Sequence, residues 1–265
     1  MKSTTVIVVA ASSDIGAHLV RHYLGRGAEV IGTYRSHTPL VSELEKAGAR
    51  LYSLDIDSKD DVASFVERLR VSGVRWDALI SAPGLLTPIG PFFQLDFDAW
   101  ERSVMTNSTS QLRVLHALYG LRSQPAKVIF FAGGGTNSAF DNYSAYCIGK
   151  LSLIKMTELL DSECPDLQVS IIGTGWVNTK IHRQTLEAGA AAGDNYEKTR
   201  GFIQNDAQSG ASLETVAECV DWCLAAPRAA VSGRNFSLVH DAWTDPQFVS
   251  RLEGAPGTYK LRRQT

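Results

Sequence analysis

Seven short runs of apolar, largely β-branched residues alternate with longer segments whose apolar residues recur at helical spacing. This alternation constrains the fold most, because strand–helix–strand units with apolar strands form parallel sheets covered on both faces. The predicted strands are 4–10, 29–34, 49–56, 77–82, 127–132, 168–173 and 235–239. The predicted helices are 12–27, 39–48, 59–73, 98–121, 144–163 and 212–225. We therefore expect an α/β fold with a doubly wound, seven-stranded parallel sheet.

The chain shows no internal repeat and no linker, so we expect one domain over residues 1–265. Its least regular part, 176–211, is rich in Gly, Ala, Gln and Asn, which favours an irregular, lid-like insertion over the ligand site. Basic side chains are in excess there, and they faintly favour an anionic substrate, although a solvated helix face explains them equally well. They are Lys180, His182, Arg183, Lys198 and Arg200.

Composition excludes several classes of protein. With 265 residues, of which 44% are hydrophobic, the chain has enough apolar surface for a large core. A net charge of −2 argues against nucleic-acid and membrane-surface binding. The four cysteines have no metal-ligand spacing and are expected to be buried thiols, so no metal is predicted. The first apolar run is too short for a signal peptide and no stretch is long enough to span a membrane, which favours a cytoplasmic protein.

The turn after the first strand has the composition of a phosphate-binding loop. In parallel sheets ligands bind at the carboxyl ends of the strands, and "AASSDIG" (10–16) follows the first one. Its small residues let backbone N–H groups approach a pyrophosphate, and the N-terminus of the next helix favours the negative charge. Ala10 and Asp14 stand where glycines are usual, and we expect Asp14 to cap the helix. A tight turn without a ligand is the alternative.

The end of the second strand favours NADP over NAD. An acidic residue at this point would bind the ribose 2′-hydroxyl of NAD, but the chain has Tyr34 followed by Arg35. An arginine here accommodates the 2′-phosphate of NADP, and Ser36 and His37 could add donors. An ordinary surface arginine is the alternative interpretation.

Tyr146 and Lys150 form a pair suited to proton transfer. They are four residues apart, so they share one face of the predicted helix 144–163. A nearby ammonium favours the ionised phenol, so we expect Lys150 to lower the pKa of Tyr146 toward neutrality. With a nicotinamide cofactor, such a phenol would donate a proton to a carbonyl oxygen or accept one from an alcohol.

Taken together, the motifs resemble the short-chain dehydrogenase/reductase family over residues 5 to about 240. The matching features are "AASSDIG", "LDID" (54–57), "SAPG" (81–84), Asn107, Tyr146-x-x-x-Lys150 and "TGWVNT" (174–179). The resemblance implies a single Rossmann domain, an NAD(P)(H)-dependent oxidoreductase acting on a carbonyl or secondary alcohol, and a small-molecule substrate.

The resemblance also assigns site residues. It implies that Tyr146, Lys150 and Asn107 are catalytic, with Asn107 helping to hold a water in the proton relay. The resemblance places Ser12, Ser13 and Ile15 at the phosphates, Asp55 and Ile56 at the adenine, Ala82 and Gly84 at the adenine ribose, and Val177 and Thr179 at the nicotinamide amide. To these cofactor residues we add Ala10 in the phosphate loop, Arg35 for the 2′-phosphate, and Tyr146 and Lys150, of which Lys150 would hold the nicotinamide ribose.

The main departure from the family is a missing serine. The family's catalytic serine falls thirteen residues before the tyrosine, which is Gly133 in the run Gly133–Gly135. One hypothesis is that the glycine backbone or a nearby hydroxyl replaces it, in an active reductase. Another is a non-catalytic NADP(H)-binding sensor or assembly protein. The glycines could also admit a bulkier substrate or form a flexible turn. Pro83, in turn, removes a backbone donor from the end of the fourth strand.

The resemblance further implies a homo-oligomer, either a homodimer or a homotetramer. In the family the helices that correspond to 98–121 and 144–163 pair between subunits. Both carry apolar residues that we expect to point outward, such as Leu153 and Met156 on the second helix.

Overall fold

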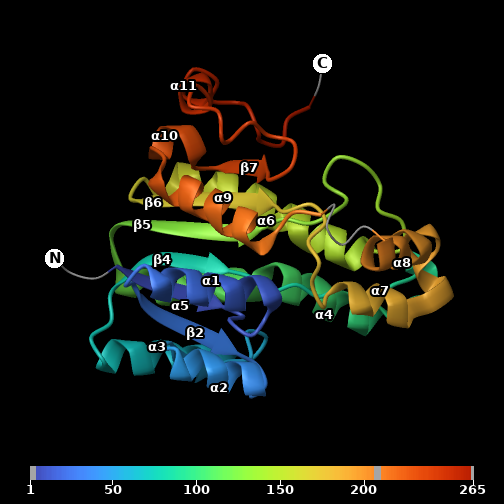
Figure 1. Ribbon diagram of the computed structural model, residues 1–265, viewed down its shortest axis with the longest axis horizontal. Helices are drawn as coiled ribbons and strands as arrows, with labels where there is room; N and C mark the ends of the chain where they lie inside the picture. Colours follow the sequence, from blue (N-terminus) through green and yellow to red (C-terminus); the bar gives the residue numbers. More distant parts are fainter. Residues whose placement is uncertain (1–3, 206–209, 264–265) are drawn as a thin grey trace.

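All seven predicted strands are present and join one parallel sheet in the computed structural model, which describes residues 4–205 and 210–263 (Figure 1). The strands are β1 (Thr5–Val9), β2 (Glu29–Tyr34), β3 (Arg50–Ser53), β4 (Trp76–Ser81), β5 (Arg122–Phe131), β6 (Leu167–Gly173) and β7 (Arg234–Ser237). Their order is β3-β2-β1-β4-β5-β6-β7, and every neighbouring pair is parallel. The predicted fold class is therefore confirmed.

Helices cover both faces of the sheet and bury one apolar cluster on each side (Figure 1). One cluster involves α1 (Asp14–Gly25), α2 (Pro39–Lys46) and α9 (Leu213–Ala225), and the other α3 (Lys59–Val71), α5 (Thr109–Leu118) and α6 (Ser144–Glu163). Along β1, Val6 and Val8 enter the first cluster and Ile7 and Val9 the second. Each such side chain contributes about 1.5–3 kcal/mol when it is fully buried.

The strand order reverses between β1 and β4, so a crevice opens at the carboxyl ends of these two strands. The arrowheads in Figure 1 point toward α7 (His182–Ala188) and α8 (Asp194–Asn205), which lie beyond this edge of the sheet. The fold thus places the loops after β1, β4, β5 and β6 together under these two helices.

The predicted helix 98–121 is wrong as a single helix. It is broken into α4 (Phe97–Asn107) and α5, followed by the 3₁₀ turn η2 (Tyr119–Leu121). Ser108 leaves the helical region, with φ −141° and ψ −88°. The Ser108 hydroxyl donates to the Val104 carbonyl, and the Asn107 amide donates to the Ser103 carbonyl. Side chains that bond to the backbone in this way compete with helix continuation, and apolar periodicity does not reveal them.

Segment 176–211 is largely helical, so the expectation of an irregular segment is wrong for most of it. It forms α7, the 3₁₀ turn η3 (Gly189–Ala192) and α8, while residues 206–209 lie outside the described residues. Gly189 and Gly193 both have φ +55° and separate the three pieces. Such conformations favour glycine, and the glycines that interrupt the helices give the sequence its irregular composition.

The outer edge of β7 is covered by the chain's own C-terminal segment, which includes α11 (Phe248–Glu253) and follows α10 (Arg228–Val231) and β7 (Figure 1). Arg234, only 2% exposed, donates hydrogen bonds to the carbonyls of Leu252, Ala255 and Thr258. The Asn235 N–H donates to the Tyr259 carbonyl at 2.8 Å. The edge strand therefore has a partner along its free side.

Apolar side chains remain exposed on α4 and α6, two helices that pack against each other. Leu153, expected to point outward, is fully buried, so that part of the prediction is wrong. The exposed residues are Phe97 and Met105 on α4 and Ile148 and Leu159 on α6. Helical spacing alone did not distinguish the sheet-facing side of α6 from its outer side.

Candidate active site

The loop after β1 folds into a tight turn that suits a pyrophosphate. Ala10 adopts φ +61°, and the Ser13 N–H donates to the Ala10 carbonyl at 2.9 Å. Ser13, rather than Asp14, caps α1, because its hydroxyl accepts a hydrogen bond from the Gly16 N–H at 3.0 Å. A Cβ atom at Gly16 would lie 2.2 Å from the Ala10 carbonyl oxygen. Gly16 is therefore needed for the turn to pack this closely against the first turn of α1. The N-terminus of a helix at such a turn is a favourable place for an anion.

Asp14 faces the segment that follows β6 instead of its own helix. Its carboxylate accepts a hydrogen bond from the Lys180 N–H at 2.5 Å. The Lys180 ammonium donates to the Ser12 carbonyl at 2.6 Å. The side chain of Ile181 lies 3.1 Å from the Cβ position of Gly84. Lys180 and Ile181 thus cross over the predicted phosphate and ribose positions.

The residues predicted to hold the adenosine end lie at the ends of β2 and β3. Arg35 is exposed and has no carboxylate partner among the described residues, whereas neighbouring His37 faces Glu45 at 3.8 Å. Asp55 and Ile56 follow β3 and are half-buried. Arg35 is therefore available to a phosphate group.

The remaining predicted cofactor residues follow β1, β4 and β6 at the same edge of the sheet. Beside the phosphate loop these are Ala82 and Gly84 after β4 and Val177 and Thr179 after β6. The Ala82 N–H donates to the Val9 carbonyl at 3.1 Å, which ties the loop after β4 to β1. The topology thus brings together segments that are far apart in the sequence.

Tyr146 and Lys150 lie side by side on α6 and are both buried. The Lys150 ammonium is 5.9 Å from the centre of the Tyr146 ring and donates to the Pro83 carbonyl at 3.0 Å. Burial lowers the pKa of Lys150 to about 7. Burial, and to a lesser degree Cys147, raises the pKa of Tyr146 above its ordinary value. The expectation that Lys150 lowers the pKa of Tyr146 is therefore not met in the chain alone, because burial disfavours the ionised phenol.

Asn107 is fully buried next to this pair. Its carbonyl oxygen accepts from the Leu85 N–H at 3.1 Å, and its amide donates to the carbonyls of Leu85 and Ser103 at 2.7 and 2.9 Å. Gly149 permits the close approach, because a Cβ there would lie 2.6 Å from the Asn107 Cβ. Asn107 thus fixes the loop after β4 and supports the helix that carries Lys150.

Gln111 is a supporting residue that the sequence prediction missed. Its side-chain carbonyl accepts from the Ser81 hydroxyl at 2.8 Å, and its amide donates to the Thr106 and Pro83 carbonyls at 3.2 and 3.4 Å. It joins the end of β4 to the break between α4 and α5. A polar residue on the buried face of a predicted helix was the only signal in the sequence.

Gly133 is required by the position of Tyr146. A Cβ atom at Gly133 would lie 2.1 Å from the Tyr146 hydroxyl and 2.4 Å from its Cζ. At Gly135, with φ +87°, a Cβ would lie 2.4 Å from the Cys147 sulfur. The Thr136 hydroxyl donates to the Gly133 carbonyl at 3.1 Å. The space that a serine would need is filled by the phenol itself.

An apolar wall surrounds Tyr146 and is held in place by α7. Leu86, Ile89 and Ala192 form a buried cluster with Tyr143 and Tyr146. Two residues of α7, Gln184 and Thr185, form hydrogen bonds to this wall and to the loop after β4. The Gln184 side chain accepts from the Leu86 and Thr87 N–H groups at 2.9 and 3.2 Å, and the Tyr143 hydroxyl donates to the Thr185 hydroxyl at 2.9 Å.

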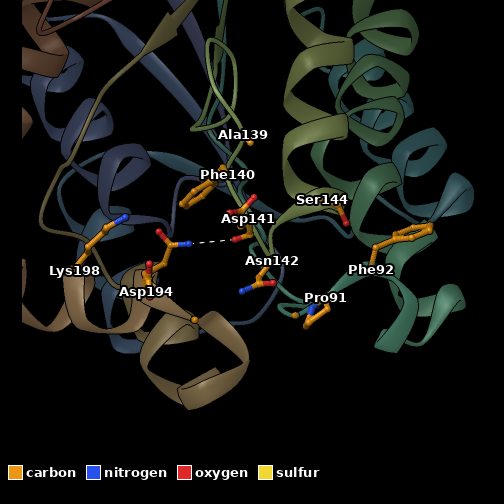
Figure 2. A pocket seen from close by; sticks show the side chains of 12 residues that line it. Pro91, Phe92, Ala139, Phe140, Asp141, Asn142, Ser144, Asp194 and Lys198 are labelled. Atoms are coloured by element: carbon orange, nitrogen blue, oxygen red, sulfur yellow. Dashed lines mark hydrogen bonds between the residues drawn. The ribbon is translucent and has the colours of Figure 1, made fainter.

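A cavity of about 690 Å³ lies outside this wall. Figure 2 shows that Asp141, Asp194 and Lys198 extend around it from facing segments. The Phe140 ring lies between the cavity and the glycine loop, since it stacks on Tyr143 at 4.2 Å and comes within 3.2 Å of the Cβ position of Gly134. The cavity therefore borders the site without being lined by Tyr146.

The basic residues of segment 176–211 do not gather in this cavity. Lys198 lines it, but Lys180 bonds the phosphate loop and Arg200 pairs with Glu197 at 2.6 Å. His182 stacks on Trp176 and contacts the Val177 carbonyl, and burial lowers its pKa. The cations are thus distributed over different contacts.

Comparison with known proteins identifies the family. A family model described as short chain dehydrogenase matches residues 4–189, and the seven-stranded parallel sheet agrees with it. The chain belongs to the short-chain dehydrogenase family, which is a family of oxidoreductases. In the described part of the chain, no helix is both long and apolar enough to cross a membrane.

Several relatives resemble the chain over most of its length. An uncharacterized oxidoreductase of Saccharomyces cerevisiae, YIR035C, is 24% identical over 209 residues, covering 76% of this chain and 82% of the relative. Its crystal structure covers 94% of this chain and 99% of its own, at 21% identity, with a TM-score of 0.79. A dihydromonapterin reductase of Escherichia coli is 23% identical over 242 residues, covering 89% and 95%. A short chain dehydrogenase of Shigella flexneri, solved with NADP, has 19% identity, coverage of 90% and 98%, and a TM-score of 0.75.

Proposed function

We propose that the protein is an NADP(H)-dependent oxidoreductase that reduces a carbonyl or oxidises a secondary alcohol, with Tyr146 as the proton donor or acceptor. The observation that carries this proposal is the buried Tyr146–Lys150 pair, next to the loops that follow β1, β4 and β6. A bound nicotinamide cofactor supplies or accepts the hydride. The neutral phenol of Tyr146 donates its proton to the carbonyl oxygen, and the reverse reaction returns it.

Lys150 is suited to restoring the proton on Tyr146. A pKa of about 7 means that its amine is present in both protonation states near neutral pH. It can therefore pass a proton to the phenolate that remains after Tyr146 has donated, and take up a new proton from solvent, while its hydrogen bond to the Pro83 carbonyl fixes its direction. The ribose hydroxyls of the cofactor are the second set of groups that Lys150 would hold.

Backbone N–H groups of the glycine loop replace the serine in this proposal. The Thr136 hydroxyl is already bonded to the Gly133 carbonyl, and the Cβ position of Gly133 is 2.1 Å from the Tyr146 hydroxyl, so the loop backbone passes close to the phenol. Consecutive N–H groups in a turn with a positive φ can bind an anion. Complete loss of one oxyanion donor would cost about 2.7–4 kcal/mol of transition-state stabilisation, so a substitute donor has a large effect on rate.

The preference for NADP rests on Arg35, which is exposed at the end of β2 and free of carboxylate partners in the described part of the chain. The Shigella structure with NADP supports binding of the same cofactor class. We further propose that the protein is cytoplasmic, that a small-molecule substrate enters past Phe140, and that α7 and α8 act as its lid.

We also propose a homo-oligomer whose interface is the face shared by α4 and α6. The exposed Phe97, Met105, Ile148 and Leu159 lie on these two helices, which pack against each other. Burying such side chains between subunits removes apolar surface from water.

The test combines cofactor titration with turnover. Fluorescence titration with NADPH should show binding by the wild type and, within a factor of about two, by Tyr146→Phe, since the phenyl ring keeps the packing. With a ketone or sugar-linked carbonyl that the wild type reduces, Tyr146→Phe should lose about 10²- to 10⁴-fold in kcat. Unchanged turnover in Tyr146→Phe would show that the proposed mechanism is wrong. Tight binding of NADPH by the wild type, with no turnover of any carbonyl, would favour the non-catalytic alternative.

A further inference from the structure

The phosphate loop carries an acidic residue at a point where acids oppose the ligand. Asp14 is the first residue of α1, whose N-terminus is where a pyrophosphate would lie. An uncompensated carboxylate at this place lies close to the phosphates and repels them. It also weakens the attraction between the phosphates and the N-terminus of α1. A chain that binds a dinucleotide here therefore needs a positive charge close to Asp14.

Lys180 is a cation that hydrogen-bonds directly to this loop. Its backbone N–H donates to the Asp14 carboxylate at 2.5 Å, and its ammonium donates to the Ser12 carbonyl at 2.6 Å. Two bonds from one residue, one from the backbone and one from the side chain, place the ammonium over the loop. The segment is held there on its far side as well, because Ile181 contacts Gly84 and Gln184 bonds the loop after β4.

The present partner of the ammonium is a weak one. Lys180 is exposed, and its ammonium has a single neutral carbonyl as its partner among the described residues. An ammonium has three donor hydrogens, and bonds to a phosphate oxygen are charge-assisted and stronger than bonds to a carbonyl. A short change of side-chain rotamer would exchange the Ser12 carbonyl for a phosphate oxygen at the N-terminus of α1.

We propose that Lys180 binds the cofactor pyrophosphate and offsets the negative charge of Asp14, so that the acidic phosphate loop of this chain can accept a dinucleotide. This inference rests on the proposed cofactor binding and adds a residue to it. Arg35 would then serve the 2′-phosphate at one end of the cofactor, while Lys180 serves the pyrophosphate that NADPH and NADH share.

The experiment measures dissociation constants of NADPH and NADH by fluorescence titration for the wild type, Lys180→Met, Lys180→Arg and Arg35→Met. Methionine keeps the length and the apolar stem of the lysine but removes its charge. We expect Lys180→Met to raise both dissociation constants about tenfold, as the loss of one charge-assisted contact does. Lys180→Arg should stay close to the wild type. Arg35→Met should weaken NADPH much more than NADH.

Charge compensation is tested by removing both partners. If Lys180 offsets Asp14, the double variant Asp14→Asn with Lys180→Met should regain most of the affinity that Lys180→Met loses. If Lys180 only holds the segment after β6 against the loop, the losses of affinity in the double variant should be additive or larger. That result would overturn the inference. Lys46→Met, at an exposed lysine on α2, is the matched control and should bind both dinucleotides as the wild type does.

The outcomes separate this inference from the proposed function. If the wild type binds the dinucleotides and Lys180→Met binds them equally well, the inference is wrong and cofactor binding stands. If Lys180→Met weakens NADPH but not NADH, the lysine reads the 2′-phosphate, and the pyrophosphate assignment is overturned. If the wild type binds neither dinucleotide, the proposed function fails and the inference fails with it. Melting curves without nucleotide, together with a second variant, Lys180→Gln, show whether a loss of binding reflects misfolding.

Discussion

At the scale of single residues, Gly133, where the family resemblance led us to expect a serine, is a packing requirement. The phenol of Tyr146 occupies the volume that a side chain at Gly133 would fill. Sequence comparison alone would treat Gly133→Ser as a repair of the active site. The contact distances predict the opposite outcome.

We expect Gly133→Ser to lower both stability and turnover. The new Cβ would lie 2.1 Å from the Tyr146 hydroxyl, so the ring must move, and overpacking of this kind costs about 1–3 kcal/mol. Urea denaturation and steady-state kinetics would measure the two effects. In a Tyr146→Ala background the stability cost of Gly133→Ser should largely disappear. An active, fully stable Gly133→Ser variant would contradict the packing argument.

The buried Lys150 predicts how the stability of the cofactor-free protein depends on pH. The unfolded chain keeps the lysine proton up to its ordinary pKa of 10.5, whereas the folded protein releases it near pH 7. Between these values the unfolded state binds more protons, so stability rises with pH, approaching about 1.4 kcal/mol per pH unit for one proton. Urea denaturation from pH 7 to 8.5 should show this rise in the wild type, and a clearly smaller one in Lys150→Met.

At the scale of elements, the site depends on how closely α6 approaches α4. Gly149 lets the two helices touch, since its Cβ position is 2.6 Å from the Asn107 Cβ and 3.2 Å from the Val104 carbonyl. This contact sets the distance between Asn107 and the turn of α6 that carries Lys150. A change in this helix contact therefore moves Asn107 and Lys150 relative to each other.

We expect Gly149→Ala to destabilise the protein by about 1–3 kcal/mol and to reduce turnover, because the helices must separate. Gly201→Ala, in the middle of α8, is the matched control, since a Cβ there meets nothing within 4 Å. It should be neutral or stabilise the protein by up to about 1 kcal/mol, as Gly-to-Ala changes in helices do. Thermal and urea denaturation of both variants would test the pair. Equal stabilities for the two would mean that the close approach of α4 and α6 is not required.

The sequence predicted elements better than it predicted their interruptions. Strands such as β1 have apolar runs that reveal them directly, and the order of the motifs located the edge of the sheet where the site lies. The break at Ser108 and the helices of segment 176–211 depend on side-chain bonds and on glycine conformations, which leave no periodic signal. The role of Lys180 was also missed. It requires knowing that Asp14 faces the segment after β6, and only the fold brings these two together.

At the scale of the whole molecule, the exposed apolar face of α4 and α6 predicts self-association. Ile148→Glu should shift the protein toward the monomer, because it places a charge in the middle of the proposed interface, where Ile148 is 47% exposed in the single chain. Sedimentation equilibrium over a range of concentrations would measure the shift. Val71→Glu, at an exposed apolar residue at the end of α3, is the control and should leave the oligomeric state unchanged. A wild type that stays monomeric throughout would contradict the proposed interface.

The C-terminal segment that Arg234 ties to β7 has a consequence for how preparations of this protein would age. Unpaired strand edges recruit further strands and seed aggregation, and here the backbone of the edge strand is paired with the Tyr259 carbonyl, which lies beyond α11. A single proteolytic cut after α11 would therefore expose part of this edge to aggregation while leaving the crevice at the ends of β1 and β4, in the middle of the sheet, intact. Samples that lose their last residues should stay able to bind ligand and yet become turbid on storage.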